Sequence, residues 1–166
     1  MSSCKISMPD GECAKCRFCC SFRRCSLWET PLIDSELLEK LRRNYPEAKF
    51  KTLNGAVTVK LDDLYRTDDP EEEALCWFNK GKGCVLGDDE PFECKVWPLR
   101  VMRKDSRLVI AFSEGCHIFS AKSLDEIREI VDEELSEKML EYAKKFPAYV
   151  KDYRENYRVI KILEEN

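Results

Sequence analysis

The sequence has no long hydrophobic run. No stretch approaches the roughly 20 consecutive apolar residues that a membrane-spanning helix needs, and residues 1–10 lack the apolar core of a secretory signal peptide. We therefore expect a protein that is neither exported nor embedded in a membrane and that works in the cytoplasm. In that reducing compartment clustered cysteines are typically metal ligands or redox groups, because thiols there stay reduced.

The sequence also lacks an excess of positive charge. It carries 28 Lys and Arg against 32 Asp and Glu, which gives a formal net charge of −4. Such a surface repels phosphate backbones, which argues against general nucleic-acid binding. A local exception is the basic segment formed by Lys15, Arg17, Arg23 and Arg24. We interpret these cations as offsetting the charge of nearby thiolates, and a surface for an acidic protein partner is the alternative.

Familiar catalytic motifs are missing as well. There is no HExxH, GxSxG, GxGxxG or GxxxxGK[ST] motif, and we interpret Gly81-Lys82-Gly83 as a turn. The chain has one histidine, His117, which directly follows Cys116. A metal ligand or proton carrier is one interpretation of His117, and an ordinary, partly buried histidine is the one we prefer. The sequence therefore indicates no internal catalytic apparatus.

Cysteine, by contrast, is abundant, with ten in 166 residues. A chain of this length buries roughly two-thirds of its unfolded surface, and 43% of the residues are hydrophobic, so disulfides are not needed to replace a missing core. Only folding can gather cysteines that are spread along the chain. We therefore predict one compact α+β domain over residues 13–166, preceded by a flexible N-terminus at residues 1–12.

Turn and cap signals predict the elements of the first two-thirds. Asp34 or Ser35 is expected to cap a helix over residues 35–43. Asn54-Gly55 predicts a hairpin in which Phe50 faces Val59 and Thr52 faces Val57. A second hairpin is expected around Asp105-Ser106, and we predict that both hairpins share one small antiparallel sheet.

The last third, about residues 121–166, is predicted to be helical. Ser123 and Glu126 match a capping box. The helix that starts there is expected to continue to Pro147, because Leu124, Ile127, Val131, Leu135 and Met139 recur at helical spacing. A second helix is expected from about Ala148, with Val150, Tyr153, Tyr157 and Ile160 on one stripe.

The most specific pattern is the run Cys13, Cys16, Cys19 and Cys20. Two residues between cysteines is the spacing at which a tight turn brings both sulfurs to one metal. Three cysteines at this interval occur in the CxxCxxC run of bacterial ferredoxins, whose fourth ligand lies elsewhere. Because neighbouring side chains diverge, we expect Cys19 and Cys20 to serve different sites or different corners of one cluster.

Further ligands are expected from Cys76, Cys84, Cys94 and Cys116, the first three of which lie in a loop-rich tract between the hairpins. The eight thiols match two four-thiolate sites, or one iron–sulfur cluster plus one zinc. Zinc is favoured by the frequency of four-thiolate zinc sites, and an iron–sulfur cluster by the ferredoxin-like triple, so both stay open. Cys4 and Cys25 fall outside the pattern and are interpreted as spare.

The order of the cysteines resembles a known family. The segments that carry the resemblance are the CxxCxxCC run, Cys76-Trp77-Phe78, Gly83-Cys84, Pro91-Phe92-Glu93-Cys94, Trp97-Pro98 and the late Cys116. Together they are similar to the CxxCxxCC family of zinc- or iron-chelating proteins, the YkgJ-like cysteine-cluster proteins, over roughly residues 13–116. Two positions depart from its pattern: Glu90 stands where the family usually has arginine, and Leu86 where it usually has an aromatic residue.

Two functional hypotheses follow. The first is a noncatalytic metal-binding protein with a role in structure, metal handling or electron transfer. The second is a metal-dependent enzyme, or the cluster subunit of a protein-modifying enzyme, which the resemblance implies because a flagellin lysine methylase contains a similar cluster. Saturated four-thiolate sites favour the first hypothesis, and three protein ligands plus an exchangeable water favour the second.

Overall fold

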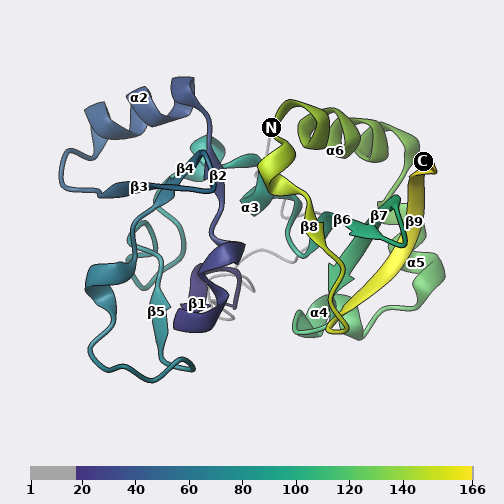
Figure 1. Cartoon of the computed structure of the whole chain (residues 1–166), viewed down its shortest axis with the longest axis horizontal. Helices are drawn as coiled ribbons and strands as arrows, with labels where there is room; N and C mark the ends of the chain where they lie inside the picture. The colour runs from purple at the N-terminus through teal and green to yellow at the C-terminus, as the bar shows by residue number, and fades with distance from the viewer. Residues whose placement is uncertain (1–17, 166) are drawn as a thin grey trace. The chain divides into compact units, whose positions relative to one another are not determined.

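The computed structural model describes residues 18–165, and the chain divides into two compact units between Lys95 and Val96 (Figure 1). The predicted flexible N-terminus, residues 1–12, lies outside the described residues. Both units contain helices and antiparallel strand pairs, so the predicted α+β class is confirmed.

The described part of the first unit, residues 18–95, contains two small antiparallel sheets. One pairs β1 (Ser21–Arg23) with β5 (Glu73–Leu75), and the other has the order β2 (Leu32–Ile33), β4 (Ala56–Val59), β3 (Phe50–Leu53). Short 3-10 turns precede β1 (η1, Phe18–Cys20), connect β1 to β2 (η2, Arg24–Glu29) and β4 to β5 (η3, Asp62–Leu64), and follow β5 (η4, Gly87–Asp89). The two sheets hold segments that are far apart in sequence against one another.

The hairpin predicted around Asn54 and Gly55 is confirmed. Both residues have positive φ angles, 52° and 81°, as a type I′ turn requires. The register is also the predicted one, with Phe50 opposite Val59 and Thr52 opposite Val57.

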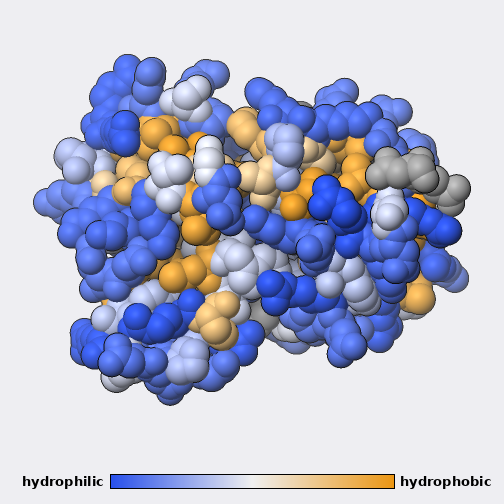
Figure 2. All heavy atoms as spheres, viewed as in Figure 1, coloured by the Kyte–Doolittle hydropathy of each residue, from blue (hydrophilic) through white to orange (hydrophobic). Residues whose placement is uncertain are grey.

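The predicted first helix is α2 (Ser35–Asn44), and Asp34 is its N-cap. The Asp34 carboxylate accepts a hydrogen bond from the Leu37 N–H at 2.9 Å. Leu41 is buried in a cluster with Ile33 and Val59, and Figure 2 shows hydrophobic side chains where α2 lies over the β3–β4 hairpin. The helix therefore packs its apolar face on the sheet and leaves its charged face in water.

The second unit contains a four-stranded sheet with the order β8, β6, β7, β9. The strands are β6 (Leu99–Lys104), β7 (Arg107–Ser113), β8 (Lys151–Asp152) and β9 (Tyr157–Glu165). The predicted hairpin β6–β7 is confirmed, and Asp105 and Ser106 form its turn at φ angles of 49° and 64°. The prediction that both hairpins share one sheet was wrong, because β6 and β7 pair instead with the C-terminal strands.

Helices α4 (His117–Ser120), α5 (Leu124–Ile130) and α6 (Glu133–Lys145) precede the last strands. The predicted capping box of Ser123 and Glu126 is confirmed. The single helix predicted up to Pro147 was wrong, because the chain breaks at Val131 and restarts with Asp132 as N-cap, which accepts from the Leu135 N–H at 2.8 Å. Within residues 18–165 no helix combines the length and apolar character needed to cross a membrane.

The helix predicted from about Ala148 was also wrong. The 3-10 turn η5 (Pro147–Tyr149) leads into β8 and then β9, which runs along β7 (Figure 1). The register along β7 shifts between Ala111, opposite Val159, and Ile110, opposite Lys161, so Ile160 is an extra residue in β9. Tyr157 and Ile160 are both buried, so the bulge produces a three-residue spacing that resembles a helical stripe.

Candidate functional site

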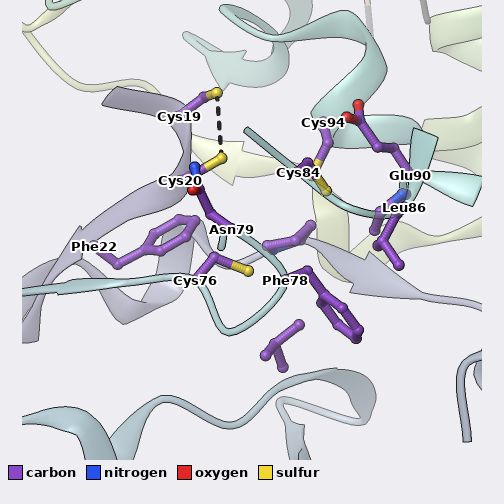
Figure 3. A pocket seen from close by; sticks show the side chains of 13 residues that line it. Cys19, Cys20, Phe22, Cys76, Phe78, Asn79, Cys84, Leu86, Glu90 and Cys94 are labelled. Carbon is purple, nitrogen blue, oxygen red and sulfur yellow. Dashed lines mark hydrogen bonds between the residues drawn. The ribbon is translucent and has the colours of Figure 1, made fainter. Parts of the chain in front are cut away.

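Five cysteines line one small pocket inside the first unit (Figure 3). They are Cys19, Cys20, Cys76, Cys84 and Cys94, and they come from three separate segments, the first of which is more than 50 residues from the other two. The pocket has a volume of about 30 Å³. A cavity needs roughly 10–15 Å³ of such volume to hold one water molecule. The pocket is therefore large enough for a single bound ion.

Cys19 and Cys20 lie at the end of η1, directly before β1. Their Sγ atoms are 3.8 Å apart, so the expectation that these neighbouring side chains diverge was wrong (Figure 3). The tight η1 turn places both thiols on the pocket wall. Four sulfurs at about 2.3 Å from a zinc ion form a tetrahedron whose edges measure about 3.8 Å. The spacing of these two sulfurs therefore fits two ligands of one metal.

Cys76 directly follows β5 and is tied to the segment that carries Cys20. Its N–H donates to the Cys20 carbonyl oxygen at 2.6 Å, one step beyond the β1–β5 pairs. Its own carbonyl accepts from the Asn79 N–H at 2.9 Å, which turns the chain back toward Cys84. Pairing of β1 with β5 therefore sets the positions of Cys20 and Cys76 together.

A short loop brings Cys84 to the same pocket. Asn79 pairs with Cys84 across this loop, and the Asn79 side-chain oxygen accepts from the Gly81 N–H at 2.9 Å. Gly81 and Gly83 have φ angles of 90° and 109°, which glycine adopts without a steric penalty. The turn predicted for residues 81–83 is thus confirmed.

Cys94 reaches the pocket from the short helix α3 (Phe92–Val96). The N–H groups of Cys94 and Lys95 donate to the Pro91 carbonyl oxygen at 3.0 and 3.2 Å. The buried Glu93 carboxylate accepts from the Leu32 N–H, which links α3 to the start of β2. This link fixes where Cys94 stands relative to the sheets of the first unit.

Apolar side chains form much of the remaining wall and affect the thiols. Phe22, Val59 and Phe78 are buried there. Burial, reinforced by the neighbouring Cys20 and Cys84, raises the pKa of the Cys76 thiol to about 12. Burial, and then Cys76 and Glu90, raises the pKa of Cys94 well above its ordinary value. Without a cation both thiols are protonated at neutral pH, and a bound cation favours their thiolate forms.

The apolar wall has no signature in the sequence. No spacing in the sequence links Phe22, Pro31 and Val59 to the cysteines, because strand pairing brings them together. Glu90 and Leu86, the two departures from the family pattern, also line the pocket, and both are buried. In the sequence these two positions stood out only as departures from the family pattern, with no sign that they would be buried beside the thiols.

Three of the eight predicted ligands are not placed at this pocket. Cys13 and Cys16 lie outside the described residues, as does Cys4. Cys116 is buried in the second unit, where it precedes α4. Cys25, interpreted as spare, is exposed, and its thiol donates to Glu71 at 3.5 Å. His117 is exposed at the start of α4, so the expectation that it is partly buried was wrong.

Part of the basic segment pairs with the acidic residues of the run 68–73. Arg23 forms an ion pair with Glu71 at 2.7 Å, and Arg24 lies 3.6 Å from Glu72. Arg24 also lies over the Tyr65 ring, whose hydroxyl donates to the Phe22 carbonyl oxygen at 2.7 Å. These contacts hold β1 beside residues 70–72, and the acidic run supplies the counter-charges of both arginines.

The described residues do not by themselves complete a metal site. Among residues 18–165 no group of three or more His, Cys, Asp or Glu side chains is arranged to hold a metal ion. All seven cysteines in this range are outside disulfide bonds. Comparisons with models of protein families, with curated proteins and with solved structures found no match for the chain. The resemblance to the CxxCxxCC family therefore stays a prediction.

Proposed function

We propose that this protein binds zinc or an iron–sulfur cluster through the cysteine pocket. The observation that supports this most is the meeting of five thiols from three separate segments at one small pocket. Thiolates are soft ligands that suit zinc and iron–sulfur clusters and do not suit magnesium or calcium. A cluster of thiols without disulfides also fits the reducing cytoplasm, which we propose as the location of the protein.

The proposed ligand set is larger than the described pocket. Cys13 and Cys16 precede Cys19 at the spacing that lets one turn present several sulfurs to a metal. We assign them as the partners of Cys19, Cys20, Cys76, Cys84 and Cys94. Cys116, which lies in the second unit, is the eighth thiol of the proposed ligand set.

A structural role is the simplest consequence of such a site. One metal would join the segment before β1, the loop between Cys76 and Cys84, and α3. Structural zinc contributes on the order of 10 kcal/mol to folding in small domains. A role in metal handling or electron transfer uses the same ligands. The enzyme alternative requires an open coordination position on the metal. Counting the thiolates bound to the metal distinguishes the two roles, because four thiolates leave no open position and three leave one.

Metal analysis of protein purified anaerobically without chelator tests this proposal. We expect at least one zinc or iron per chain. Brown protein with absorbance near 400 nm and acid-labile sulfide would identify an iron–sulfur cluster. Colourless protein that contains zinc would identify a zinc site. Cys84→Ser should lose at least half of the metal, whereas Cys25→Ser should keep it, because Cys25 is exposed and does not line the pocket. Equal metal content in both variants would contradict the assignment.

A further inference from the structure

Cys20 and Cys76 stand opposite each other one residue beyond the paired strands β1 and β5. In the β1–β5 pair Ser21 is opposite Leu75, so one step along the antiparallel register places Cys20 opposite Cys76. The Cys76 N–H donates to the Cys20 carbonyl oxygen, which shows that pairing continues to this step. Opposite residues of an antiparallel pair project to the same face, and both thiols line the pocket (Figure 3).

The backbone separation at this step suits a disulfide. Hydrogen-bonded opposite residues have Cα atoms about 5.5 Å apart, within the roughly 4.4–6.8 Å that disulfides span. Cys19 and Cys20 have closer sulfur atoms, but the Cα atoms of consecutive residues are only about 3.8 Å apart, which lies outside that range.

The other pocket thiols in the described part of the chain have different neighbours. Cys84 is opposite Asn79 in its loop, and Cys94 lies on α3 and not on a paired strand. Among the described pocket cysteines, Cys20 and Cys76 are therefore the two that the pairing of β1 with β5 places opposite one another.

We propose that Cys20 and Cys76 form a reversible cross-strand disulfide when the metal-free protein meets a small-molecule disulfide. One cysteine, as thiolate, attacks a sulfur of the small disulfide, forms a mixed disulfide and releases one small thiol. The second cysteine, as thiolate, attacks the protein sulfur of that mixed disulfide and releases the second small thiol. Two electrons pass to the small disulfide, and the two protons from the cysteines end on the released thiols.

This disulfide is strained, which makes it reversible. Hydrogen-bonded opposite residues have Cβ atoms up to about 5.5 Å apart, whereas disulfides hold theirs at about 3.5–4.5 Å, so the bond must draw the strands together. Strained disulfides are more easily reduced and are typically the regulatory ones. The inference goes beyond the proposed function, because it needs only the two thiols. Where the metal also binds, oxidation removes two of its ligands.

Peptide mapping of the full-length protein tests the pairing. The protein is freed of metal with a chelator, the chelator is removed, and oxidised glutathione is added before alkylation and digestion with trypsin. Cleavage after Arg17, Arg23, Arg66 and Lys80 gives peptide 18–23, with Cys19 and Cys20, and peptide 67–80, with Cys76 as its one cysteine. Mass spectrometry without reduction then detects a link between the two peptides.

We expect the linked peptides in the wild type, in Cys19→Ser and in Cys25→Ser, and their disappearance on treatment with dithiothreitol. Cys20→Ser should reduce their abundance at least tenfold, with circular dichroism as the check that this variant is folded. Wild-type protein without the link would overturn the proposal, as would loss of the link in Cys19→Ser or its persistence in Cys20→Ser. Mass spectrometry detects the link whether or not the purified protein held a metal, so these results are read separately from the metal analysis.

Discussion

At the scale of single residues, the cysteine pocket is lined by thiols together with apolar aromatic rings. Cys76 and Cys94 are neutral in this apolar setting, whereas a metal ligand is a thiolate, so metal binding must release protons from them. The residue types and the CxxC spacing predicted a gathering of thiols. They could not predict that Glu90 and Leu86 would be buried beside those thiols, because this depends on the pairing of distant strands.

Glu72 gives a prediction about pH. Its carboxylate accepts from the N–H of Arg66 at 2.7 Å and from the hydroxyl and N–H of Thr67, which lowers its pKa from 4.5 to about 2. A carboxylate whose pKa is lower in the folded than in the unfolded state stabilises the protein. This stabilisation is fully present above the unfolded-state pKa and is lost as the pH falls through the folded-state pKa. We expect Glu72→Gln to be less stable than the wild type at pH 7, with a difference that shrinks between about pH 5 and 2.

Urea unfolding of both proteins at several pH values measures this difference. Glu73→Gln is the matched control, because Glu73 is an exposed neighbour with the same charge. A stability difference for Glu72→Gln that stays constant from pH 7 to pH 2 would show that the carboxylate is not held in its ionised form.

Caps and turns explain which elements were predictable. Asp34, Ser123 and the Asn54-Gly55 turn act through bonds within a few residues, so the sequence predicted them. The C-terminal strand was missed because the bulge at Ile160 gives a strand the spacing of a helix, and because β9 is stabilised by pairing with the distant β7. The β-branched residues within 157–162 favour a strand, and this preference was the signal in the sequence that could have identified β9.

The break between α5 and α6 predicts a role for Asp132. Its carboxylate satisfies the Leu135 N–H, which has no partner within its own helix. Asp132→Ala should lower the free energy of unfolding by about 1 kcal/mol, measured by urea unfolding. Glu137→Ala, an exposed change in the middle of α6, should alter it by less than about 0.5 kcal/mol. Equal effects would contradict the capping role.

The β3–β4 turn gives a second prediction at this scale. Gly55 has a φ of 81°, and no atom would contact an added Cβ within 4 Å. Gly55→Ala should therefore cost only the backbone penalty, about 1–2 kcal/mol in thermal or urea unfolding. Asn54→Gly should be tolerated, since Asn54 also has a positive φ. An unchanged stability for Gly55→Ala would indicate a different turn.

For the whole molecule, the metal proposed at the cysteine pocket belongs to the first of two compact units. The second unit has its own buried residues, among them Met102, Ile110, Phe112, Phe119 and Met139. The first unit has small sheets and the cysteine pocket. We expect chelation to raise hydrogen exchange in residues 18–95 at least tenfold while β6 and β7 stay protected. Equal loss of protection in both units would contradict a local structural role for the metal.

X-ray absorption at the zinc or iron edge, on protein purified without chelator, tests the central claim most directly. The account predicts a first coordination shell dominated by sulfur at about 2.3 Å, with four thiolates per zinc or a cluster pattern of sulfur and iron scatterers. Protein without stoichiometric metal, or a metal surrounded mainly by oxygen and nitrogen, would contradict it.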